Sequence, residues 1–484
     1  MMIATFTTDK LPTIAWFVYL LSAILFIQGL RYMNSPKTAR KGNFVSIAGM
    51  IIASVMAIID SSAAGFHSGI ALGMLIAGVV LGAIIGVVSA KKVHMTAMPQ
   101  LVSLFNTVGG GAAALVAIND ALSPAHGGID IGHSVPGLIS AALGIIIGAI
   151  TFSGSLVAAG KLQGIVSGSA IKIPGKLVID LISLAGVIFF SFMLVTGQGF
   201  GYPMWVAVVL IAVFGLILGL TFALPIGGAD MPVVISVLNA CTGTAVAMAG
   251  FVINNLVMIV AGALVGAAGA ILSLLMAKAM NRSLLSVLGG GFGNSDTDST
   301  SAGETGDSAP LRETSADDLA VQLAYANSVI IVPGYGLAVA GAQHEIADLT
   351  KLLEEKGVDV KFAIHPVAGR MPGHMNVLLA EANIPYEKLL DMDDVNPLFQ
   401  TADVALVVGA NDVTNPAARR QGTPISGMPI LDVDKAKSAV VVKRGRGKGY
   451  AGIENELYSL PNTSMLYGDA KKAIADVIVA VKEL

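Results

Sequence analysis

Four short segments in the last third of the chain carry residue types that suit a nucleotide ligand. The first is the glycine turn Gly334, Tyr335 and Gly336, which follows a β-branched run and leads into a helix-forming stretch. This order of parts lets a backbone approach a pyrophosphate at the amino terminus of a helix. The same residues also suit a plain tight turn, so the other segments must help to decide between the two interpretations.

The second segment begins at His365 and continues with Val367, Ala368, Gly369, Arg370, Met371, Pro372 and Gly373. A typical NAD site has an acidic residue near this strand end, where it holds the ribose 2′-hydroxyl. His365 stands there instead, which argues against NAD. Arg370 lies between glycines and is able to hold phosphate oxygens with two parallel hydrogen bonds, although a solvated loop arginine is the alternative.

The third segment comprises Gly409, Ala410, Asn411 and Asp412. A carboxylate beside a glycine at a strand end is well placed to contact a ribose or to sense charge at the site. An Asn-Asp pair also forms turns without any ligand, so that alternative stays open here.

The fourth segment alternates cations with glycines and comprises Lys443, Arg444, Gly445, Arg446, Gly447, Lys448, Gly449 and Tyr450. It lies in a region that is acidic overall, so the pattern indicates a local anion that the backbone must approach closely. A 2′-phosphate fits, which favours NADP over NAD. The alternatives are a solvated loop and a nucleic-acid patch, but nucleic acid is not expected as a partner of an acidic, membrane-tethered domain.

The elements expected around these segments are those of a parallel sheet. Strand-like runs occupy residues 328–332, 358–364, 403–408, 439–442 and 464–466, and helix-like stretches occupy 339–356, 374–382 and 469–481. This alternation predicts a Rossmann-like α/β domain with helices on both faces of the sheet and ligands at the carboxyl ends of the strands. The four segments fall at or just after those ends.

The chain before this domain has the composition of a membrane protein. With 54% hydrophobic and 13% charged residues, and a mean hydropathy of +0.76, the chain is too apolar for a soluble protein. Residues 1–290 carry a formal charge of +6 and the remainder −9. The single cysteine, Cys241, excludes a disulfide framework and any multi-cysteine metal site, and no metal site is expected.

Nine apolar runs are long enough to cross a bilayer. They lie near residues 12–30, 44–59, 68–90, 99–118, 135–158, 177–196, 203–223, 232–252 and 256–277. The basic residues of the first, third and fifth connections are Arg31, Lys37, Arg40 and Lys41, then Lys91 and Lys92, then Lys161, Lys172 and Lys176. Because positive connections stay in the cytoplasm, this pattern predicts a nine-helix bundle with its amino terminus outside and its carboxyl-terminal domain inside.

Small and charged residues within the runs predict how the helices pack. Glycines four residues apart, as at 78, 82 and 86 or at 262 and 266, allow two helices to approach closely. Asp180 stands four residues after Lys176, so an ordinary ion pair along one helix is expected.

Three polar residues at or near membrane depth are candidate functional residues. They are Asn106 in the fourth run, Asn239 in the eighth, and Asp230 at the cytoplasmic end of the eighth. Hydrocarbon offers such groups no partners, so they tend to face a cavity or one another. Asp230 also suits a cap for the helix that begins near Pro232, and Asn239 also suits a hydrogen bond between helices.

Composition changes abruptly between the two parts of the chain. Residues 289–310 are rich in Gly, Ser, Thr, Asp and Asn without an apolar period, which predicts a flexible linker. The expected domains are therefore a transmembrane domain at 1–288 and a nucleotide-binding domain at 311–484.

Together these residues resemble the beta subunit of proton-translocating NAD(P) transhydrogenases over nearly the full chain. Besides the nine spans, the resemblance rests on Gly-Gly-Ala-Asp-Met-Pro-Val-Val at 227–234, Ala-Met-Asn-Arg-Ser at 279–283, Pro-Gly-Tyr-Gly at 333–336, His-Pro-Val-Ala-Gly-Arg at 365–370, Gly-Ala-Asn-Asp at 409–412 and Gly-Tyr-Ala-Gly at 449–452. Such a set in this order is highly specific.

The resemblance implies an enzyme that passes hydride directly between NAD(H) and NADP(H) while protons cross a bacterial-type inner membrane. In this family the carboxyl-terminal domain binds NADP(H), with the nucleotide in the reverse of the usual Rossmann orientation. A separate alpha subunit carries the NAD(H) site and further membrane helices, and two copies of each subunit assemble. The lack of a second dinucleotide unit in this sequence agrees with that division.

The resemblance also implies roles for particular residues. The nucleotide contacts fall on the four segments above, completed by Asp469 and Ala470, with Lys443 and Arg444 at the 2′-phosphate. Asp230 and Asn239 match polar positions tied in the family to proton passage or to its coupling to the soluble domain. Many family members carry a histidine where this chain has Asn106, and an amide cannot carry a proton by ordinary titration. We expect Asn106 to order water, and the titrating group to lie on the partner subunit or elsewhere.

Two other classes of protein stay open on sequence grounds. One is a solute transporter with a nucleotide-sensing domain, and the other is a membrane-tethered binding module without catalysis. A co-expressed chain with its own NAD site would favour the enzyme.

Overall fold

The computed structural model describes most of the chain. The described residues are 11–33, 35–63, 69–122, 135–168, 170–197, 202–227, 230–280, 283–284, 287, 311–369, 373–423, 425–445, 449 and 451–484. They divide into two compact units. The mainly helical first unit includes the described residues of 1–93, 100–228 and 234–272, and the second unit includes those of 94–99, 229–233 and 273–484.

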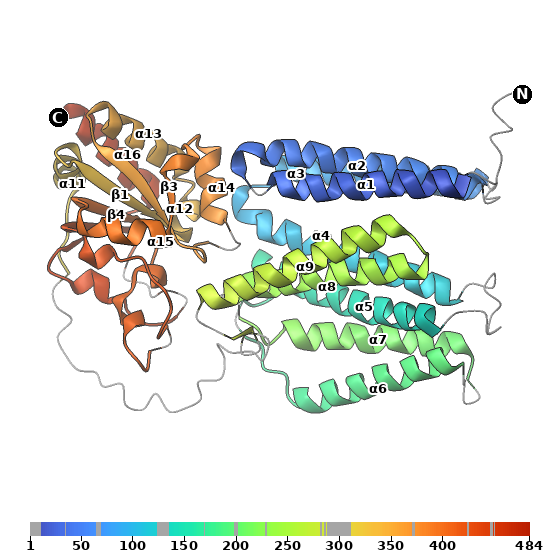
Figure 1. The fold of residues 1–484 in the computed structure, drawn as a ribbon. Helices are drawn as coiled ribbons and strands as arrows, with labels where there is room; N and C mark the ends of the chain where they lie inside the picture. The colour runs from blue at the N-terminus through green and yellow to red at the C-terminus, as the bar shows by residue number, and fades with distance from the viewer. Residues whose placement is uncertain are drawn as a thin grey trace, which may run out of the picture. The chain divides into compact units, whose positions relative to one another are not determined.

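Nine helices of the described residues are long and apolar enough to cross a membrane. They are α1 (Leu11–Met33), α2 (Pro36–Ala63), α3 (Gly69–Lys92), α4 (Met98–Leu122), α5 (Val135–Gln163), α6 (Lys176–Thr196), α7 (Met204–Ala223), α8 (Met231–Val252) and α9 (Leu256–Ala279), all labelled in Figure 1. Each coincides with one expected span, which confirms the helical membrane part.

The second helix is longer than its apolar run. It begins at Pro36, a residue type favoured at the first helical position. Lys37, Arg40 and Lys41 therefore lie in the first turns of α2, so the prediction that placed them in a connection was wrong. The same holds at other helix ends for Arg31, Lys91, Lys92, Lys161 and Lys176. The apolar period alone does not reveal these turns, because their side chains are polar.

Close packing through glycine is confirmed for one pair of helices, whereas the glycines of α3 meet no partner among the described residues. A Cβ on Gly243 of α8 would lie 2.3 Å from the backbone nitrogen of Gly266, so α8 and α9 meet through glycine. Around Gly78, Gly82 and Gly86 of α3, no described atom lies within 4 Å of such a Cβ. Among the described residues, therefore, no other helix packs on the α3 glycines.

The carboxyl-terminal domain contains one sheet of six described strands, all parallel, in the order β3-β2-β1-β4-β5-β6. The strands are β1 (Ser328–Pro333), β2 (Asp359–Ile364), β3 (Leu389–Asp391), β4 (Val404–Val408), β5 (Ser438–Lys443) and β6 (Thr463–Tyr467). Five of them match the expected strands. β3 was missed, because three residues at a sheet edge carry too little pattern to recognise.

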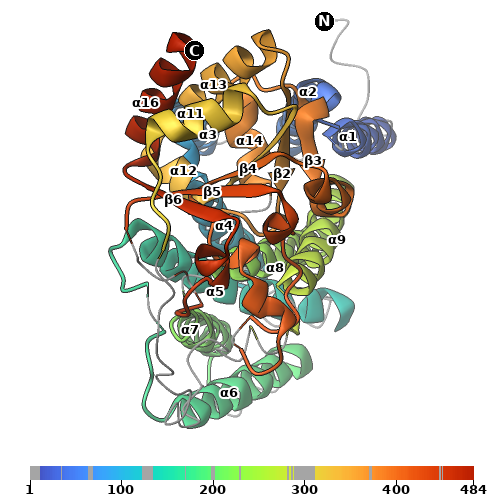
Figure 2. The ribbon, with the colours of Figure 1, turned by 90° about the vertical axis from the view of Figure 1, so that its left-hand side faces the viewer.

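Alternate residues of each central strand point to opposite faces of the sheet. Val329 and Ile331 of β1 join one apolar core, whereas Ile330 and Val332 join the other. Figure 2 shows the longer helices above the sheet: α11 (Ala316–Ala324), α12 (Tyr335–Ala340), α13 (Gln343–Glu355), α14 (His374–Glu381) and α16 (Ala470–Glu483). Short helical segments, including α15 (Met392–Val395), cover the other face. This arrangement confirms the Rossmann-like domain.

One expected helix is in fact two. The sequence predicts a helix over 339–356, but α12 ends at Ala340, its capping residue Gly341 has a φ of 63° in the left-handed region, and α13 begins at Gln343. A glycine in this conformation commonly ends a helix. The break keeps α12 short and leaves its amino terminus at the glycine turn.

Candidate functional site

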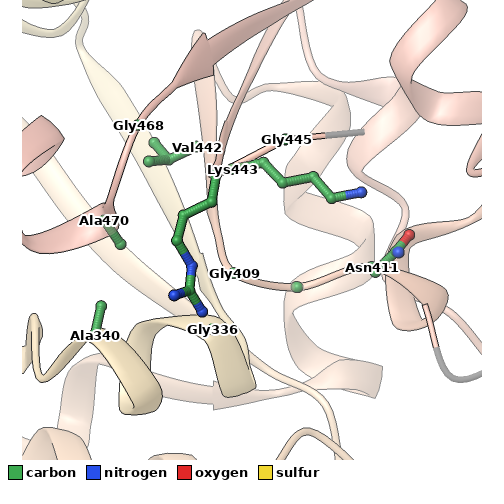
Figure 3. Close-up of a pocket in the computed structure, with 11 residues that line it drawn as sticks. Gly336, Ala340, Gly409, Asn411, Val442, Lys443, Gly445, Gly468 and Ala470 are labelled. Carbon is green, nitrogen blue, oxygen red and sulfur yellow. The ribbon is translucent and has the colours of Figure 1, made fainter. Parts of the chain in front are cut away.

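A cavity of about 290 Å³ lies where β1, β4, β5 and β6 end (Figure 3). Its lining residues are Gly336, Ala340, Gly409, Ala410, Asn411, Val442, Lys443, Arg444, Gly445, Gly468 and Ala470. β1 and β4 are the two central strands from which the strand order runs in opposite directions, the place where sheets of this type bind ligands. The cavity therefore occupies the site that the sheet topology predicts.

The glycines of the first and third segments bring two backbones together. The Gly336 amide donates a 3.0 Å hydrogen bond to the Gly409 carbonyl, and a Cβ on Gly334 would lie 2.4 Å from the backbone of Ala410. Gly409 itself has a φ of 71°, in the left-handed region. The sequence assigned these glycines to phosphate approach, and the structure adds a second need for them, which is backbone contact between the turns after β1 and β4.

Lys443 and Asn411 are held by one aromatic side chain. The Lys443 ammonium lies 4.7 Å from the centre of the Tyr458 ring, and the Tyr458 hydroxyl donates a 3.1 Å hydrogen bond to Asn411 Oδ1. Figure 3 shows Lys443 and Asn411 on the wall of the cavity. Burial lowers the pKa of Lys443, while the charge of Asp412 raises it. Tyr458 was missed by the sequence, because no motif marks it.

Asp412 braces a neighbouring turn and does not line the cavity. Its Oδ2 accepts a 3.0 Å hydrogen bond from the Ala451 amide, and a Cβ on Gly449 would lie 2.3 Å from its Oδ1. The third segment is thereby joined to the end of the cation-rich fourth segment. The expected ribose contact of Asp412 is not tested by these contacts.

The second segment is organised by two buried histidines. His365 Nε2 lies 2.8 Å from the Pro429 carbonyl, and its Nδ1 accepts a 3.2 Å hydrogen bond from the Val367 amide. A carbonyl only accepts, so Nε2 carries the proton and the ring is neutral. Burial lowers the pKa of His365 to about 4. Gly369, with a φ of 106°, packs against the His374 ring, where a Cβ would lie 2.5 Å from Nδ1.

The remaining predicted site residues divide between the cavity and its surroundings. Asp469 caps α16 by accepting a 3.1 Å hydrogen bond from the Lys471 amide, and Ala470 follows it on the cavity wall. Val367, Ala368, Gly369 and Gly373 follow β2 and are not among the described lining residues. Arg370, Met371, Pro372, Arg446, Gly447, Lys448 and Tyr450 lie outside the described residues. Val442 and Gly468 were missed, although each lies beside a predicted residue.

A second polar site lies in the membrane helices. Asn106 of α4 is 4% exposed, and its Nδ2 donates a 3.4 Å hydrogen bond to the Ile235 carbonyl of α8. The Thr242 hydroxyl donates to the Asn106 carbonyl, also at 3.4 Å. Ser103 of α4 separately donates a 2.8 Å hydrogen bond to the Ser155 carbonyl of α5. α4 therefore makes polar contacts with α8, through Asn106, and with α5, through Ser103.

The other two membrane candidates lie on or beside α8. Asn239 is half-buried, and Ser236 on the same helix donates a 3.2 Å hydrogen bond to the Gly269 carbonyl of α9. Asp230 immediately precedes α8 and is fully buried, and its carbonyl accepts a 3.1 Å hydrogen bond from the Val233 amide. The expected ion pair between Lys176 and Asp180 is confirmed at 2.6 Å.

Comparison with known proteins decides the family. The sequence model of the NAD(P) transhydrogenase beta subunit matches residues 15–480. The chain is also 45% identical, over 96% of its own length and 98% of the relative's, to the NAD(P) transhydrogenase subunit beta of Rhodospirillum rubrum. The NAD(P) transhydrogenase subunit beta of Rhodospirillum rubrum strain ATCC 11170 has the same identity and coverage.

The chain belongs to the NAD(P) transhydrogenase beta subunit family. This membership confirms the resemblance found from the short motifs. A transhydrogenase is an oxidoreductase that uses nicotinamide nucleotides, and a beta subunit implies an alpha subunit as partner. The cavity at the ends of β1, β4, β5 and β6 is thus the candidate nucleotide site of a transhydrogenase beta subunit.

Proposed function

We propose that this chain binds NADP(H) and forms part of the proton path of an enzyme that couples hydride transfer between NAD(H) and NADP(H) to proton translocation. The observation that carries the proposal is the position of Lys443 and Arg444 in the cavity at the carboxyl edge of the sheet. Family membership supplies the reaction class, and these two cations supply the choice of nucleotide.

The residues of the cavity fit an anionic dinucleotide. None of the described lining residues is acidic, two are cationic, and four are glycines that leave backbone groups open to a ligand. The terminal phosphate of NADP(H) needs cations that NAD(H) does not. Lys443 and Arg444 would hold that phosphate, while the turns at Gly336 and Gly409 would face the pyrophosphate.

The location of the cations supports the reversed nucleotide orientation. A typical Rossmann site recognises the ribose 2′ position at the end of the second strand. Here that place holds the neutral, buried His365, and the cations follow β5 on the other side of the central strands. The usual site for the ribose 2′ position lies on the β2 side of the central strands. A 2′-phosphate bound by Lys443 and Arg444 would therefore lie on the opposite side, next to β5.

The chain's own residues would bind and orient the nucleotide, and NADP(H) when bound supplies or accepts the hydride. The second nucleotide would come from the alpha subunit, because this sequence holds one dinucleotide unit. The proposed assembly contains two alpha and two beta subunits in a bacterial-type inner membrane. The amino terminus would lie outside and residues 311–484 would form a cytoplasmic domain, joined to a membrane domain at 1–288 by the linker 289–310.

The proton path is proposed to include Asn106, Asn239 and Asp230. The hydrogen bond between Asn106 and the Ile235 carbonyl supports this, since it brings α4 and α8 together at a buried polar contact. Asn106 would order water, and the titrating group would lie on the partner subunit or elsewhere. One proton crossing 100 mV supplies about 2.3 kcal/mol, which shifts a hydride equilibrium by roughly fifty-fold.

The test is reconstitution of the two-subunit enzyme in vesicles. Reduction of an NAD analogue by NADPH is followed together with the pH of the vesicle lumen, for the native enzyme and for Lys443→Met and Arg444→Met. Each variant should bind NADPH at least about ten-fold more weakly, because a buried or clustered charge contact to phosphate is worth at least about 1.4 kcal/mol. Vesicles that take up a solute in response to nucleotide, without hydride exchange, would support a transporter instead.

Coupling is tested at Asp230. We expect Asp230→Ala to keep the NADPH affinity of the enzyme, because this residue lies outside the nucleotide cavity, and to lose proton pumping during hydride transfer. Coupling requires that the nucleotide state and the access of protons both bias one shared two-state element of the protein. Asp230 and the linker would form the mechanical contact that transmits this bias. Intact pumping in the variant would contradict this role.

A further inference from the structure

Lys161 is a buried cation that none of the roles above uses. It lies in the last turn of α5 and is 5% exposed. Its ammonium donates hydrogen bonds of 2.5 Å to the Leu224 carbonyl and 2.7 Å to the Ile226 carbonyl. A buried ammonium is costly in a membrane helix and marks a functional position more often than a packing one.

Both carbonyls belong to the turn that follows α7, residues 224–227, here called the α7–α8 turn. α7 ends at Ala223, and the Leu224 carbonyl also accepts a 3.1 Å hydrogen bond from the Ile171 amide. The turn is thus fixed from two directions, by the end of α5 and by the segment that follows α5. Three residues separate it from Met231, the first residue of α8.

Close contacts between α5 and α7 hold Lys161 next to this turn. The Ser153 hydroxyl donates a 2.9 Å hydrogen bond to the Leu216 carbonyl of α7. A Cβ on Gly219 would lie 2.4 Å from the Ile150 carbonyl, so the two helix backbones are nearly in contact. Two helices packed this closely have little freedom to slide, and the position of the ammonium is therefore fixed relative to the turn.

Ending a helix does not require a lysine. α6 ends at Thr196 and is followed by Gly197, whose φ of 69° lies in the left-handed conformation that commonly ends helices without a side chain. α7 likewise has a backbone cap, a 3.0 Å hydrogen bond from the Leu224 amide to the Leu220 carbonyl. Lys161 binds the Leu224 and Ile226 carbonyls beyond that cap, where the helix dipole is negative. The lysine adds something that glycine cannot, which is a fixed distance between the α7–α8 turn and α5.

We propose that Lys161 is a positioning residue for proton coupling: it holds the α7–α8 turn in one place beside α5, in the same unit as the part of α8 that contacts Asn106. α8 carries the Ile235 carbonyl and Thr242, which contact Asn106. This inference rests on the proposed function, since it assigns Lys161 to the coupling of hydride transfer to proton movement. Nucleotide binding would not depend on Lys161, which lies in a separate part of the chain.

The test uses the reconstituted two-subunit enzyme with Lys161→Met, which keeps the length of the side chain and removes its donors, and Lys161→Arg, which keeps charge and donors. The matched control is Lys92→Met, because Lys92 is an exposed lysine at the end of α3. The measurement is the number of protons that enter the lumen per hydride transferred from NADPH to an NAD analogue. NADPH affinity is measured on the same samples.

We expect Lys161→Met to lower the ratio of protons to hydride at least about two-fold at unchanged NADPH affinity, and Lys161→Arg and Lys92→Met to keep the native ratio. A native ratio in Lys161→Met, or an equal loss in Lys161→Arg, would overturn the proposal. If Lys161→Met does not assemble, Lys161→Gln decides, because its shorter amide cannot reach both carbonyls and should lower the ratio too; an unchanged ratio there overturns the proposal. A native enzyme that transfers no hydride would overturn the proposed function itself.

Discussion

The Lys443 ammonium lies 4.7 Å from the centre of the Tyr458 ring, at the wall of the cavity proposed to bind NADP(H). An aromatic face attracts a cation without neutralising its charge, so the lysine is held in place and still acts on an anion. The Tyr458 hydroxyl at the same time fixes Asn411 through its 3.1 Å hydrogen bond. One side chain thus positions two residues from different strand ends.

Tyr458→Leu should weaken NADPH binding more than Tyr458→Phe does. Leucine removes the ring beneath Lys443, a contact worth about 0.5–2 kcal/mol, and we expect a loss of roughly 2–30-fold in affinity. Phenylalanine keeps the ring and loses the hydroxyl, so only the bond to Asn411 is lost, for a change of about 2–10-fold. NADPH titration of the purified enzyme measures both, with the exposed Tyr325 replaced by leucine as control. Equal affinities in the two variants would show that the ring does not position Lys443.

Gly334→Ala should destabilise the carboxyl-terminal domain more than Gly341→Ala. The added Cβ at 334 would lie 2.4 Å from the backbone of Ala410, which cannot move aside like a flexible side chain, and we expect a cost of about 1–3 kcal/mol or more. At 341 the Cβ meets open space, and only the left-handed φ of 63° costs about 1 kcal/mol. Calorimetry of the unfolding of the carboxyl-terminal domain compares the two variants. A smaller loss of stability in Gly334→Ala than in Gly341→Ala would contradict the close approach of the two backbones.

The parts of the fold with strong local pattern were predictable. The nine spans follow from apolar length, and β1 and β4 follow from continuous runs of Val, Ile, Leu and Ala, because strands buried on both faces need no polar alternation. β3 was not predictable, since its three residues are defined by pairing with β2. The break at Gly341 was missed because the residues on both sides favour helix, and one glycine decides between one helix and two.

The candidate site was predictable where residues bind through backbone or charge. Glycine turns and a run of cations are visible in sequence, and Gly336, Gly409 and Lys443 do line one cavity. Tyr458 and Lys161 were not identified as site residues, because their importance comes from contacts with residues distant in the chain. In the sequence Lys161 is indistinguishable from an ordinary basic residue at a helix end, and only the structure reveals its two carbonyl partners.

His365 should make the stability of the domain depend on pH. Its folded pKa of about 4 lies below the ordinary value of 6.5, so between these values the unfolded chain binds more protons at this position. The contribution of neutral His365 to stability is therefore complete above pH 6.5 and is lost as the pH falls from 6.5 towards 4. His365→Asn should melt at a lower temperature at pH 7.5 and show a smaller further decrease on going to pH 5 than the native enzyme. His344→Asn, at an exposed position, is the control, and a native-like pH slope in His365→Asn would refute this account.

Asn106→His should add to proton pumping a pH dependence beyond that of the native enzyme. Histidine is the side chain that ordinarily changes charge between about pH 5 and 8, whereas the amide of Asn106 does not titrate. The new ring would stand where the Asn106 amide now bonds to the Ile235 carbonyl, inside the polar contact between α4 and α8. The measured quantity is the number of protons pumped per hydride transferred, from pH 5.5 to 8. Its change over this range should be at least about two-fold larger in the variant than in the native enzyme. The matched control is Asn119→His, the same substitution at an exposed position on the same helix, which should leave the profile unchanged. Identical profiles for all three enzymes would place the proton path away from Asn106.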